Sequence, residues 1–291
     1  MTSPDDRLTT SISYRERKMQ AWVNGVLLDD PSQPALSTLD HGATVGDGVF
    51  ETVKVVSNQP FALTRHLERL DRSANGLGLP VPDRARILDA IKLVLAQQDY
   101  PLGRLRVTYT GGISPLGSAR GSGPCTLSVV ADVAEPAAAT AAVVTVPWVR
   151  NERGAVAGLK TTSYAENVVA LAHAHARGAS EAIFANTRGD LCEATGSNIF
   201  LVIDGDILTP PLSSGALAGV TRALVLEWCG GKERELPADA LEEADELFLA
   251  GTTRDIQPID RCDDRAIAAP GPVTADAAQI WARKAAEHPD P

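Results

Sequence analysis

The stretch Gly154-Ala-Val-Ala-Gly158-Leu159-Lys160-Thr161 leads from a glycine-containing segment into a region with helical periodicity. Because glycine interrupts regular structure, residues 150–158 are predicted to connect two domains. Lys160 follows this connection among small and apolar neighbours. Burial disfavours the ammonium form of a lysine and makes its amine a usable nucleophile. For this stretch alone, a solvated loop lysine is the simpler interpretation.

The same stretch resembles a phosphate-binding P-loop at first sight. A Walker A loop has four residues between its glycines and a lysine directly after the second one. Here three residues separate Gly154 from Gly158, and Leu159 precedes the lysine. A slip of one residue moves the lysine away from phosphates that backbone amides would hold. The sequence therefore does not predict nucleotide binding at this loop.

Hydrophobic patterns on both sides of the connection predict an α+β chain. Before it we expect a hairpin at 20–28, strands at 49–56, 105–110, 125–133 and 141–148, and helices at 64–76 and 84–98. After it we expect helices at 164–177 and 220–229 and strands at 181–185, 192–203, 207–209, 247–250 and 256–259. The predicted division is a flexible tail at 1–18, a small α+β domain at 19–149, the connection at 150–158 and a larger mixed-sheet domain at 159–291.

The bulk composition is typical of a folded globular protein. Of 291 residues, 44% are apolar and 22% are charged. The net charge is −10 and the basic residues are scattered, so neither a nucleic acid nor an anionic membrane is expected as a partner. The first residues lack the order of a signal peptide, and no apolar run approaches the roughly 20 residues of a membrane span. We expect a cytoplasmic protein that binds a small molecule.

Cysteine and histidine spacing does not predict a metal site. The four cysteines lie tens of residues apart without a C-x-x-C pair, so reduced structural thiols are expected. His173 and His175 are two residues apart on an expected helix. A rotation of about 100° per residue turns their side chains away from each other, so they cannot share a metal ion.

The stretch Leu191-Cys192-Glu193-Ala194-Thr195-Gly196-Ser197-Asn198-Ile199-Phe200 predicts a strand with an acid among apolar residues. A period of two places Glu193 and Thr195 on one face. A carboxylate with little water around it is costly unless a cationic or protonated group meets it, and a pyridinium nitrogen would serve. An ion pair with a nearby arginine is the simpler alternative.

Two further segments could bind an anion. Residues 213–222 lead from a loop into a helix, where free amides and the helix dipole gather and Thr221 adds a hydroxyl. Simple N-capping by serine or threonine is the alternative there. Residues 250–255 place small hydroxyl side chains at a strand end. Arg69 could supply the counter-charge, although alone it suggests only a surface helix arginine.

Five motifs follow one another along the chain: His66-Leu-Glu-Arg69-Leu, Gly158-Leu-Lys160, Glu193-Ala-Thr-Gly-Ser-Asn198, Gly219-Val-Thr221-Arg222 and Gly251-Thr252-Thr253. In order and spacing they resemble the class IV aminotransferases, the fold-type IV enzymes that depend on pyridoxal 5′-phosphate (PLP). The resemblance runs over about residues 20–259. It implies a homodimer whose active site lies between a smaller α+β domain and a larger mixed-sheet domain.

The resemblance also implies a role for each matching residue. The family's Gly-x-Lys lysine forms a Schiff base with PLP, which implies Lys160. The family's strand acid binds the pyridine nitrogen, which implies Glu193. The contacts implied for the phosphate fall on Arg69, Val220, Thr221 and Thr252, and the contact implied for the ring falls on Leu217.

One tyrosine departs from the family pattern. Branched-chain members carry a tyrosine five residues after the lysine, where it bonds the phenolic oxygen of the cofactor. Tyr164 is four residues after Lys160. The resemblance therefore assigns no role to Tyr164.

Two reactions of such enzymes diverge after the freed lysine amine removes a proton from the substrate. An aminotransferase releases a keto acid, whereas 4-amino-4-deoxychorismate lyase expels pyruvate and leaves the folate precursor p-aminobenzoate. Residues 158–167 and 251–258 look most like chains assigned as aminodeoxychorismate lyases, so the lyase is our leading prediction. An amino-acid aminotransferase of the D-amino-acid or branched-chain type, an enzyme with both activities and a non-catalytic small-molecule-binding protein stay open.

Substrate-side residues bear on this choice. D-amino-acid transaminases resemble the chain at residues 46–51 but carry Arg-x-His where it has Gly111 and Ile113. Branched-chain enzymes usually have a tyrosine-rich pocket, and this chain is only 4% aromatic. Because a planar guanidinium pairs a carboxylate bidentately, the candidates for the substrate's carboxylates are two arginines and an adjacent threonine: Arg106, Arg254 and Thr253. A structural ion pair is the alternative for either arginine.

Overall fold

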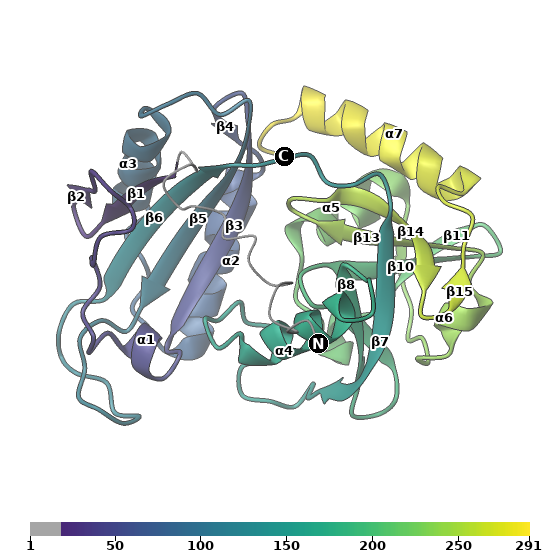
Figure 1. Cartoon of the computed structure of the whole chain (residues 1–291), viewed down its shortest axis with the longest axis horizontal. Coiled ribbons are helices and arrows are strands. Elements are labelled where there is room, and N and C mark those ends of the chain that lie inside the picture. Colours follow the sequence, from purple (N-terminus) through teal and green to yellow (C-terminus); the bar gives the residue numbers. More distant parts are fainter. Residues whose placement is uncertain (1–18) are drawn as a thin grey trace, which may run out of the picture.

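The computed structural model describes residues 19–291. These residues form two β-sheets, one from each half of the chain (Figure 1). The tail expected at residues 1–18 lies outside the described residues. The first sheet is antiparallel and has the strand order β2-β1-β6-β5-β3-β4. Its strands are β1 (Gln20–Val23), β2 (Val26–Leu27), β3 (Gly48–Val56), β4 (Gln59–Pro60), β5 (Leu102–Thr110) and β6 (Thr126–Val133).

Helices α2 (Leu63–Leu77) and α3 (Arg84–Leu95) cover one face of the first sheet, and the short helix α1 (His41–Thr44) precedes β3. Side chains alternate along a strand, so Val49, Val53 and Val55 of β3 all enter the core beneath these helices. Phe50 falls on the other face. Lys160 of the second half lies over the Phe50 ring, so this face is turned toward the second sheet.

The second sheet has nine strands and mixes parallel with antiparallel pairs, in the order β12-β11-β10-β13-β14-β7-β8-β9, with β15 beside β14. Its strands are β7 (Ala141–Arg150), β8 (Glu181–Asn186), β9 (Leu191–Ala194), β10 (Asn198–Ile203), β11 (Asp206–Thr209), β12 (Lys232–Glu233), β13 (Glu246–Gly251), β14 (Asp255–Cys262) and β15 (Arg265–Ala266).

Helices bury both faces of this sheet. Helices α5 (Val220–Cys229) and α7 (Pro272–Glu287) close a core around Phe200, Phe248 and Trp281. Helix α4 (Ala165–His175) packs on β7 and β8, and α6 (Ala240–Glu243) packs over a separate core on the sheet. A 3₁₀ turn, η1 (Leu212–Ser214), precedes α5. Within residues 19–291, no helix combines the length and apolar character needed to cross a membrane.

The division between the sheets differs from the boundary expected at residue 150. Strand β7 pairs in parallel with β8 and β14, and its Val143 is buried in the core of the second sheet. The chain therefore passes from the first sheet to the second between β6 and β7. The pattern of β7 shows that it is a strand but does not say which sheet completes its hydrogen bonds, and from the pattern alone it was therefore placed in the smaller domain.

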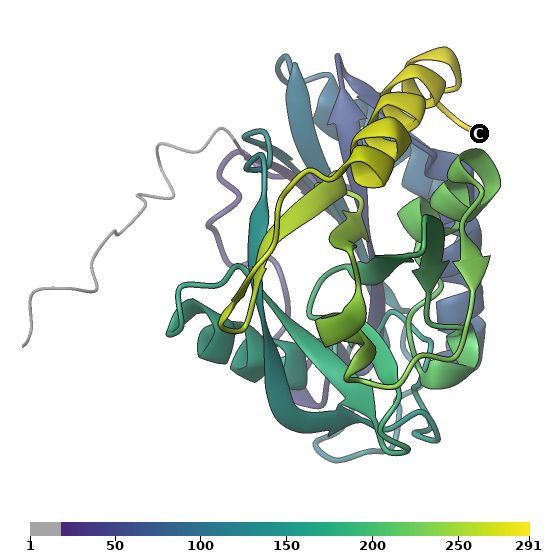
Figure 2. The ribbon, with the colours of Figure 1, turned by 90° about the vertical axis from the view of Figure 1, so that its right-hand side faces the viewer.

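Two other differences have local causes. The single strand expected at 192–203 is two strands, because the carboxylate of Glu181 accepts hydrogen bonds from a turn, Thr195-Gly196-Ser197, that interrupts it. Thr195 donates a hydrogen bond to Glu181 and lines the same cavity as Glu193. The sequence also gave no expectation for α7, which crosses toward the first sheet, where Pro289 accepts a hydrogen bond from Ala62 (Figure 2).

Candidate active site

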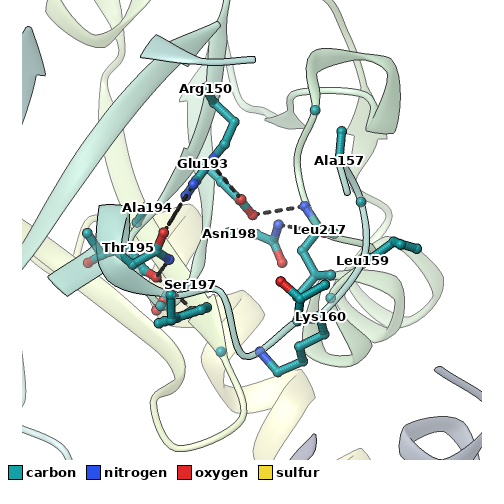
Figure 3. A pocket seen from close by; sticks show the side chains of 18 of the residues that line it. Arg150, Ala157, Leu159, Lys160, Glu193, Ala194, Thr195, Ser197, Asn198 and Leu217 are labelled. Atoms are coloured by element: carbon teal, nitrogen blue, oxygen red, sulfur yellow. Dashed lines mark hydrogen bonds and ion pairs between the residues drawn. The ribbon is translucent and has the colours of Figure 1, made fainter. Parts of the chain in front are cut away.

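One cavity of about 260 Å³ brings together every residue to which the resemblance gave a cofactor role. Most of its lining comes from the second half of the chain, and Arg69 of α2 joins it from the first half. Figure 3 shows how Lys160, Glu193 and Leu217 approach it from different segments. The residues with predicted cofactor roles that line it are Arg69, Lys160, Glu193, Leu217, Val220, Thr221 and Thr252.

Backbone pairing with β3 fixes the position of Lys160. Its carbonyl accepts a hydrogen bond from the Phe50 amide at 3.0 Å, and its own amide donates to Ser73 Oγ at 3.1 Å. The Lys160 Nζ lies 4.5 Å from the centroid of the Phe50 ring. Burial, and then the positive charge of Arg69, lower the pKa of Lys160 to about 8. A substantial fraction of this amine is therefore neutral near physiological pH.

Glu193 occupies another part of the cavity. Its Oε2 accepts a hydrogen bond of 2.9 Å from the Leu217 amide, and its Oε1 lies 3.5 Å from Arg150 Nε (Figure 3). Burial raises the pKa of Glu193, and Arg150 partly offsets that effect. The arginine partner considered from the sequence is thus present, but its Nε makes no hydrogen bond to any described residue. Oε1 of Glu193 keeps acceptor capacity for a protonated ring nitrogen.

The start of α5 forms an anion site in this cavity. Among residues 19–291 no side chain caps the helix at Gly219, so the capping alternative is not observed and the first helical amides have no capping partner there. A Cβ atom on Gly219 would overlap Oδ1 of Asn198, which itself is held by the Leu217 carbonyl. Thr252 approaches from the end of β13. Free amides, a helix dipole and hydroxyl groups converge here, as anion binding requires.

Arg69 is buried beside this helix start rather than exposed on the surface. It donates from Nη1 to the Ala218 carbonyl at 3.0 Å, in the loop that leads into α5. It also makes a bidentate contact with Glu51 of β3. A cation therefore lies next to the free amides of α5.

These residues fit PLP. Three groups line the cavity. Glu193 is an acceptor for the pyridine nitrogen, and Lys160 is an amine for the aldehyde. The start of α5, with Arg69 and Thr252, is an anion site for the phosphate. Each of these groups has a counterpart on the cofactor molecule. The sequence motifs name these residues one after another, and the fold brings their side chains to the same cavity.

The two predicted substrate arginines have different surroundings. The guanidinium of Arg106 lies 3.5 Å over the Phe50 ring, whose centroid is also near Lys160 Nζ. Arg106 makes no hydrogen bond or ion pair with any of residues 19–291, and burial lowers its pKa. A cation with free donors therefore lies beside the reactive amine.

Arg254 and Thr253 do not line the cavity with Lys160. Arg254 donates to Gln257 Oε1 at 2.5 Å and lies 3.2 Å from the Glu181 carboxylate. Together with Thr253 it lines a separate cavity of about 490 Å³. The structural ion pair is thus the observed arrangement for Arg254, because Glu181 is buried and needs a counter-charge.

Tyr164 lies beside the Phe50 ring, edge to face, with ring centroids 5.4 Å apart. Its hydroxyl donates to the Thr195 carbonyl at 3.1 Å. Burial, and then Glu193, raise the pKa of this phenol. Tyr164 therefore buttresses the turn that forms part of the cavity wall.

Sequence reasoning missed several groups that support the site. Arg150 ends β7 and meets Glu193, and Asn167 joins it through two hydrogen bonds of 3.0 Å. Glu51 holds Arg69, and Phe50 lies beneath Lys160. An acid at position 51 within an apolar strand pattern was an available signal. No local pattern marks Arg150, because its partner is on another strand.

Comparison with known proteins gives the family. Residues 48–262 match the model described as "Amino-transferase class IV". A relative from Methanocaldococcus jannaschii, named a putative branched-chain-amino-acid aminotransferase, is 31% identical and covers 86% of this chain and 90% of its own. A Mycobacterium tuberculosis protein, named a bifunctional aminodeoxychorismate lyase and D-amino acid transaminase, is also 31% identical, over 78% of this chain and 83% of its own.

A solved structure of an aminotransferase has a similar fold. The branched-chain aminotransferase of Thermoproteus uzoniensis, determined with norvaline, has 30% identity and a TM-score of 0.83, and the match covers 91% of this chain and 94% of that one. Relatives named as aminotransferases thus match nearly the whole described chain. The chain belongs to the class IV aminotransferases, enzymes of the fold-type IV architecture that depend on PLP.

Proposed function

We propose that this chain is an amino-acid aminotransferase of the branched-chain or D-amino-acid type, with Lys160 as the residue that carries PLP. The observation that carries the proposal is the buried amine of Lys160 in one cavity with Glu193 and the start of α5, where no side-chain cap is found among residues 19–291. When bound, PLP supplies a sink for the electrons released as the substrate's C–H bond breaks. Each of the following roles belongs to a residue of the chain.

Lys160 acts as the base. Its pKa of about 8 suits the amine to accept the substrate's α-proton and return it later, since the pKa of an effective general base lies near the working pH. Glu193 holds a proton at the ring nitrogen, because its Oε1 keeps acceptor capacity beside Arg150, whose charge favours the ionised form. Arg69, Thr252 and the α5 amides hold the phosphate. Leu217 bounds the cavity against the ring.

Arg106 binds the substrate's carboxylate. Its donors are free and its guanidinium lies over Phe50, next to the reactive amine. A desolvated guanidinium with free N–H groups recovers its lost hydration by pairing with a carboxylate. One available arginine matches an amino acid that carries a single carboxylate beside its amino group.

Aminodeoxychorismate lyase activity is the second candidate. The relative with both activities supports it, as do the segments that suggested the lyase from sequence. The lyase substrate carries two carboxylates, and Arg106 and Arg254 are the arginines expected near them from the sequence. Arg254 is engaged by Glu181 and Gln257, so the support from a second arginine is lost. Transamination therefore takes precedence.

The deciding experiment uses purified protein loaded with PLP. Borohydride reduction followed by peptide mass analysis should attach a pyridoxyl group to Lys160 and to no other lysine. Keto-acid formation is then measured from alanine and leucine, each as the D- and L-isomer, alongside p-aminobenzoate release from aminodeoxychorismate. Formation of keto acid without release of p-aminobenzoate would support aminotransferase activity. Release of p-aminobenzoate without keto acid would replace it with the lyase, and a colourless, unmodified protein would favour the non-catalytic binding protein.

The homodimer that the resemblance implies also stays a proposal. Exposed apolar side chains occur at the end of β7 and on α4, namely Trp148, Val149, Val168 and Val169. These two segments are neighbours, since Arg150 bonds Asn167. A second copy of the chain would cover such a surface. Light scattering should give twice the chain mass of 30.6 kDa, and a monomer at micromolar concentration would contradict it.

A further inference from the structure

A carboxylate lies where the sequence pattern of β3 calls for an apolar residue. Glu51 is on the helix-facing side of the strand, between the core residues Val49 and Val53, and its side chain is 0% exposed. Burial of an ionised carboxylate costs several kcal/mol unless charged hydrogen bonds replace the lost water. The presence of a carboxylate in this core therefore has to be explained by the groups that Glu51 contacts.

Within residues 19–291, the carboxylate makes its hydrogen bonds with side chains of α2. Arg69 donates from Nε to Oε1 at 2.8 Å and from Nη2 to Oε2 at 2.7 Å. His66, one turn earlier on the same helix face, lies with Nδ1 2.7 Å from Oε2. An ionised carboxylate only accepts, so His66 Nδ1 donates. Two parallel bonds fix the plane of the Arg69 guanidinium as well as its position.

This arrangement determines which Arg69 donors remain. A guanidinium has five N–H groups. Glu51 engages two of them along the Nε–Nη2 edge, and the Ala218 carbonyl accepts one from Nη1. The remaining N–H groups belong to Nη1 and Nη2. They lie on a side chain that lines the cavity next to the free amides of α5.

We propose that Glu51 is a positioning residue, which fixes Arg69 so that its remaining N–H groups meet the phosphate of PLP. The inference rests on the proposed function, since it takes the cavity at Lys160 as the cofactor site. It adds that phosphate recognition depends on a residue of β3 that does not line the cavity. Without Glu51 the long Arg69 side chain would have to be ordered by the phosphate itself, at a cost in rotamer entropy.

A purely electrostatic role of Glu51 predicts the opposite change in phosphate affinity from a positioning role. Burial by itself would raise the pKa of Glu51, but Arg69 and His66 lower it to about 2, so the group is ionised at neutral pH. Burial also lowers the pKa of His66, which favours its neutral form. The Glu51–Arg69 pair thus has no net charge. If Glu51 were only a counter-ion, its neutralisation would strengthen phosphate binding, whereas a positioning role requires that binding weaken.

The test compares PLP with pyridoxal, which lacks the phosphate. Affinities of both for the apoprotein are measured by fluorescence for the wild type and Glu51→Gln. We expect Glu51→Gln to reduce the preference for PLP over pyridoxal about tenfold, which corresponds to the loss of one well-placed charged hydrogen bond. Pyridoxal affinity should stay unchanged. Asp71→Asn is the matched control, because Asp71 pairs with Arg84 on the exposed side of α2 and should alter neither affinity.

Two further variants separate positioning from folding. Glu51→Asp keeps the charge but withdraws the carboxylate by one methylene group, so it should also reduce the preference. In an Arg69→Lys background, Glu51→Gln should cause little additional loss, since its effect passes through the guanidinium. An equal fall in PLP and pyridoxal affinity, or the same loss in both backgrounds, would show a general structural role and overturn the proposal.

The two proposals fail in different ways. Wild-type protein that captures PLP at Lys160, together with a Glu51→Gln variant that keeps or increases its preference for PLP, overturns only the positioning role. Wild-type protein without preference for PLP over pyridoxal, and without covalent capture at Lys160, overturns the proposed function and the positioning role with it.

Discussion

The Arg150 Nε lies 3.5 Å from Oε1 of Glu193, although 42 residues separate the two in the chain. Arg150 ends β7 and Glu193 lies on β9, and β8 separates these strands in the sheet. The guanidinium also stacks over Phe184 at 4.3 Å. Arg150 is thus held by packing and by Asn167, and it places a positive charge behind the carboxylate. The acidity of Glu193 depends on this neighbour.

Replacing Arg150 should therefore slow the reaction. Arg150→Met keeps bulk over Phe184 but removes the charge that offsets burial of Glu193, so the pKa of Glu193 rises. A proton shared with the ring nitrogen then moves toward Glu193. We expect kcat to fall on the order of tenfold for each pKa unit. The ¹⁵N chemical shift of the bound cofactor's ring nitrogen reports the proton's position. Arg153→Met is the control, because that side chain is 80% exposed. Unchanged kcat and shift in Arg150→Met would contradict this role.

The pH dependence of cofactor capture should follow Lys160. The pKa of this amine is lowered from 10.5 to about 8, so the neutral form appears as pH rises through 8. The rate of covalent PLP capture by apoprotein should rise to a plateau above about pH 8, rather than continue to 10.5. Because the folded pKa is the lower one, the cost of burying the charged amine also disappears between pH 8 and 10.5. Stopped-flow absorbance measures the rate, and Lys160→Ala should lose it at every pH.

Gly219→Ala should damage the phosphate site. The added Cβ would overlap Asn198 Oδ1, and Asn198 cannot move away without releasing the Leu217 carbonyl. We expect a loss of about 1–3 kcal/mol in the free energy of unfolding, as for other overpacked sites. PLP affinity should fall while α5 stays helical. Gly123→Ala is the control, since its Cβ meets only ordinary contact distances. Wild-type affinity in Gly219→Ala would show that the helix start is not part of the site.

The two substrate arginines should give opposite results. Arg106→Gln is expected to raise KM for the amino acid by about 10- to 100-fold, because charged hydrogen bonds to the carboxylate are lost. Arg254→Gln should leave KM unchanged but lower the free energy of unfolding by about 1–3 kcal/mol, since buried Glu181 loses its counter-charge. Steady-state kinetics and urea unfolding of both variants measure these effects. A raised KM in Arg254→Gln alone would reverse the assignment and restore support for the lyase.

Local patterns predicted much of the fold. The helix at 220–229 is observed with the same bounds as α5, and the other expected helices differ only at their ends. Their periodicity reports burial of one face, which is a local property. Pairing between strands is not local, and the two differences that matter arose there: β7 belongs to the second sheet, and Glu181 breaks the strand expected at 192–203.

The family and the available chemical groups follow from the order of five short motifs along the chain, which needs no knowledge of the fold. The sequence left N-capping open at the start of α5, and the structure shows no side-chain cap at Gly219 within residues 19–291. Which charged side chains are paired within residues 19–291 depends on the folded arrangement. Glu181 forms an ion pair with Arg254. Glu51 binds Arg69 through two hydrogen bonds and leaves other Arg69 N–H groups toward the cavity. Arg106 has no ion-pair partner in the described chain. A charge's partner depends on distance in space, and residues far apart in sequence become neighbours only when the sheets form.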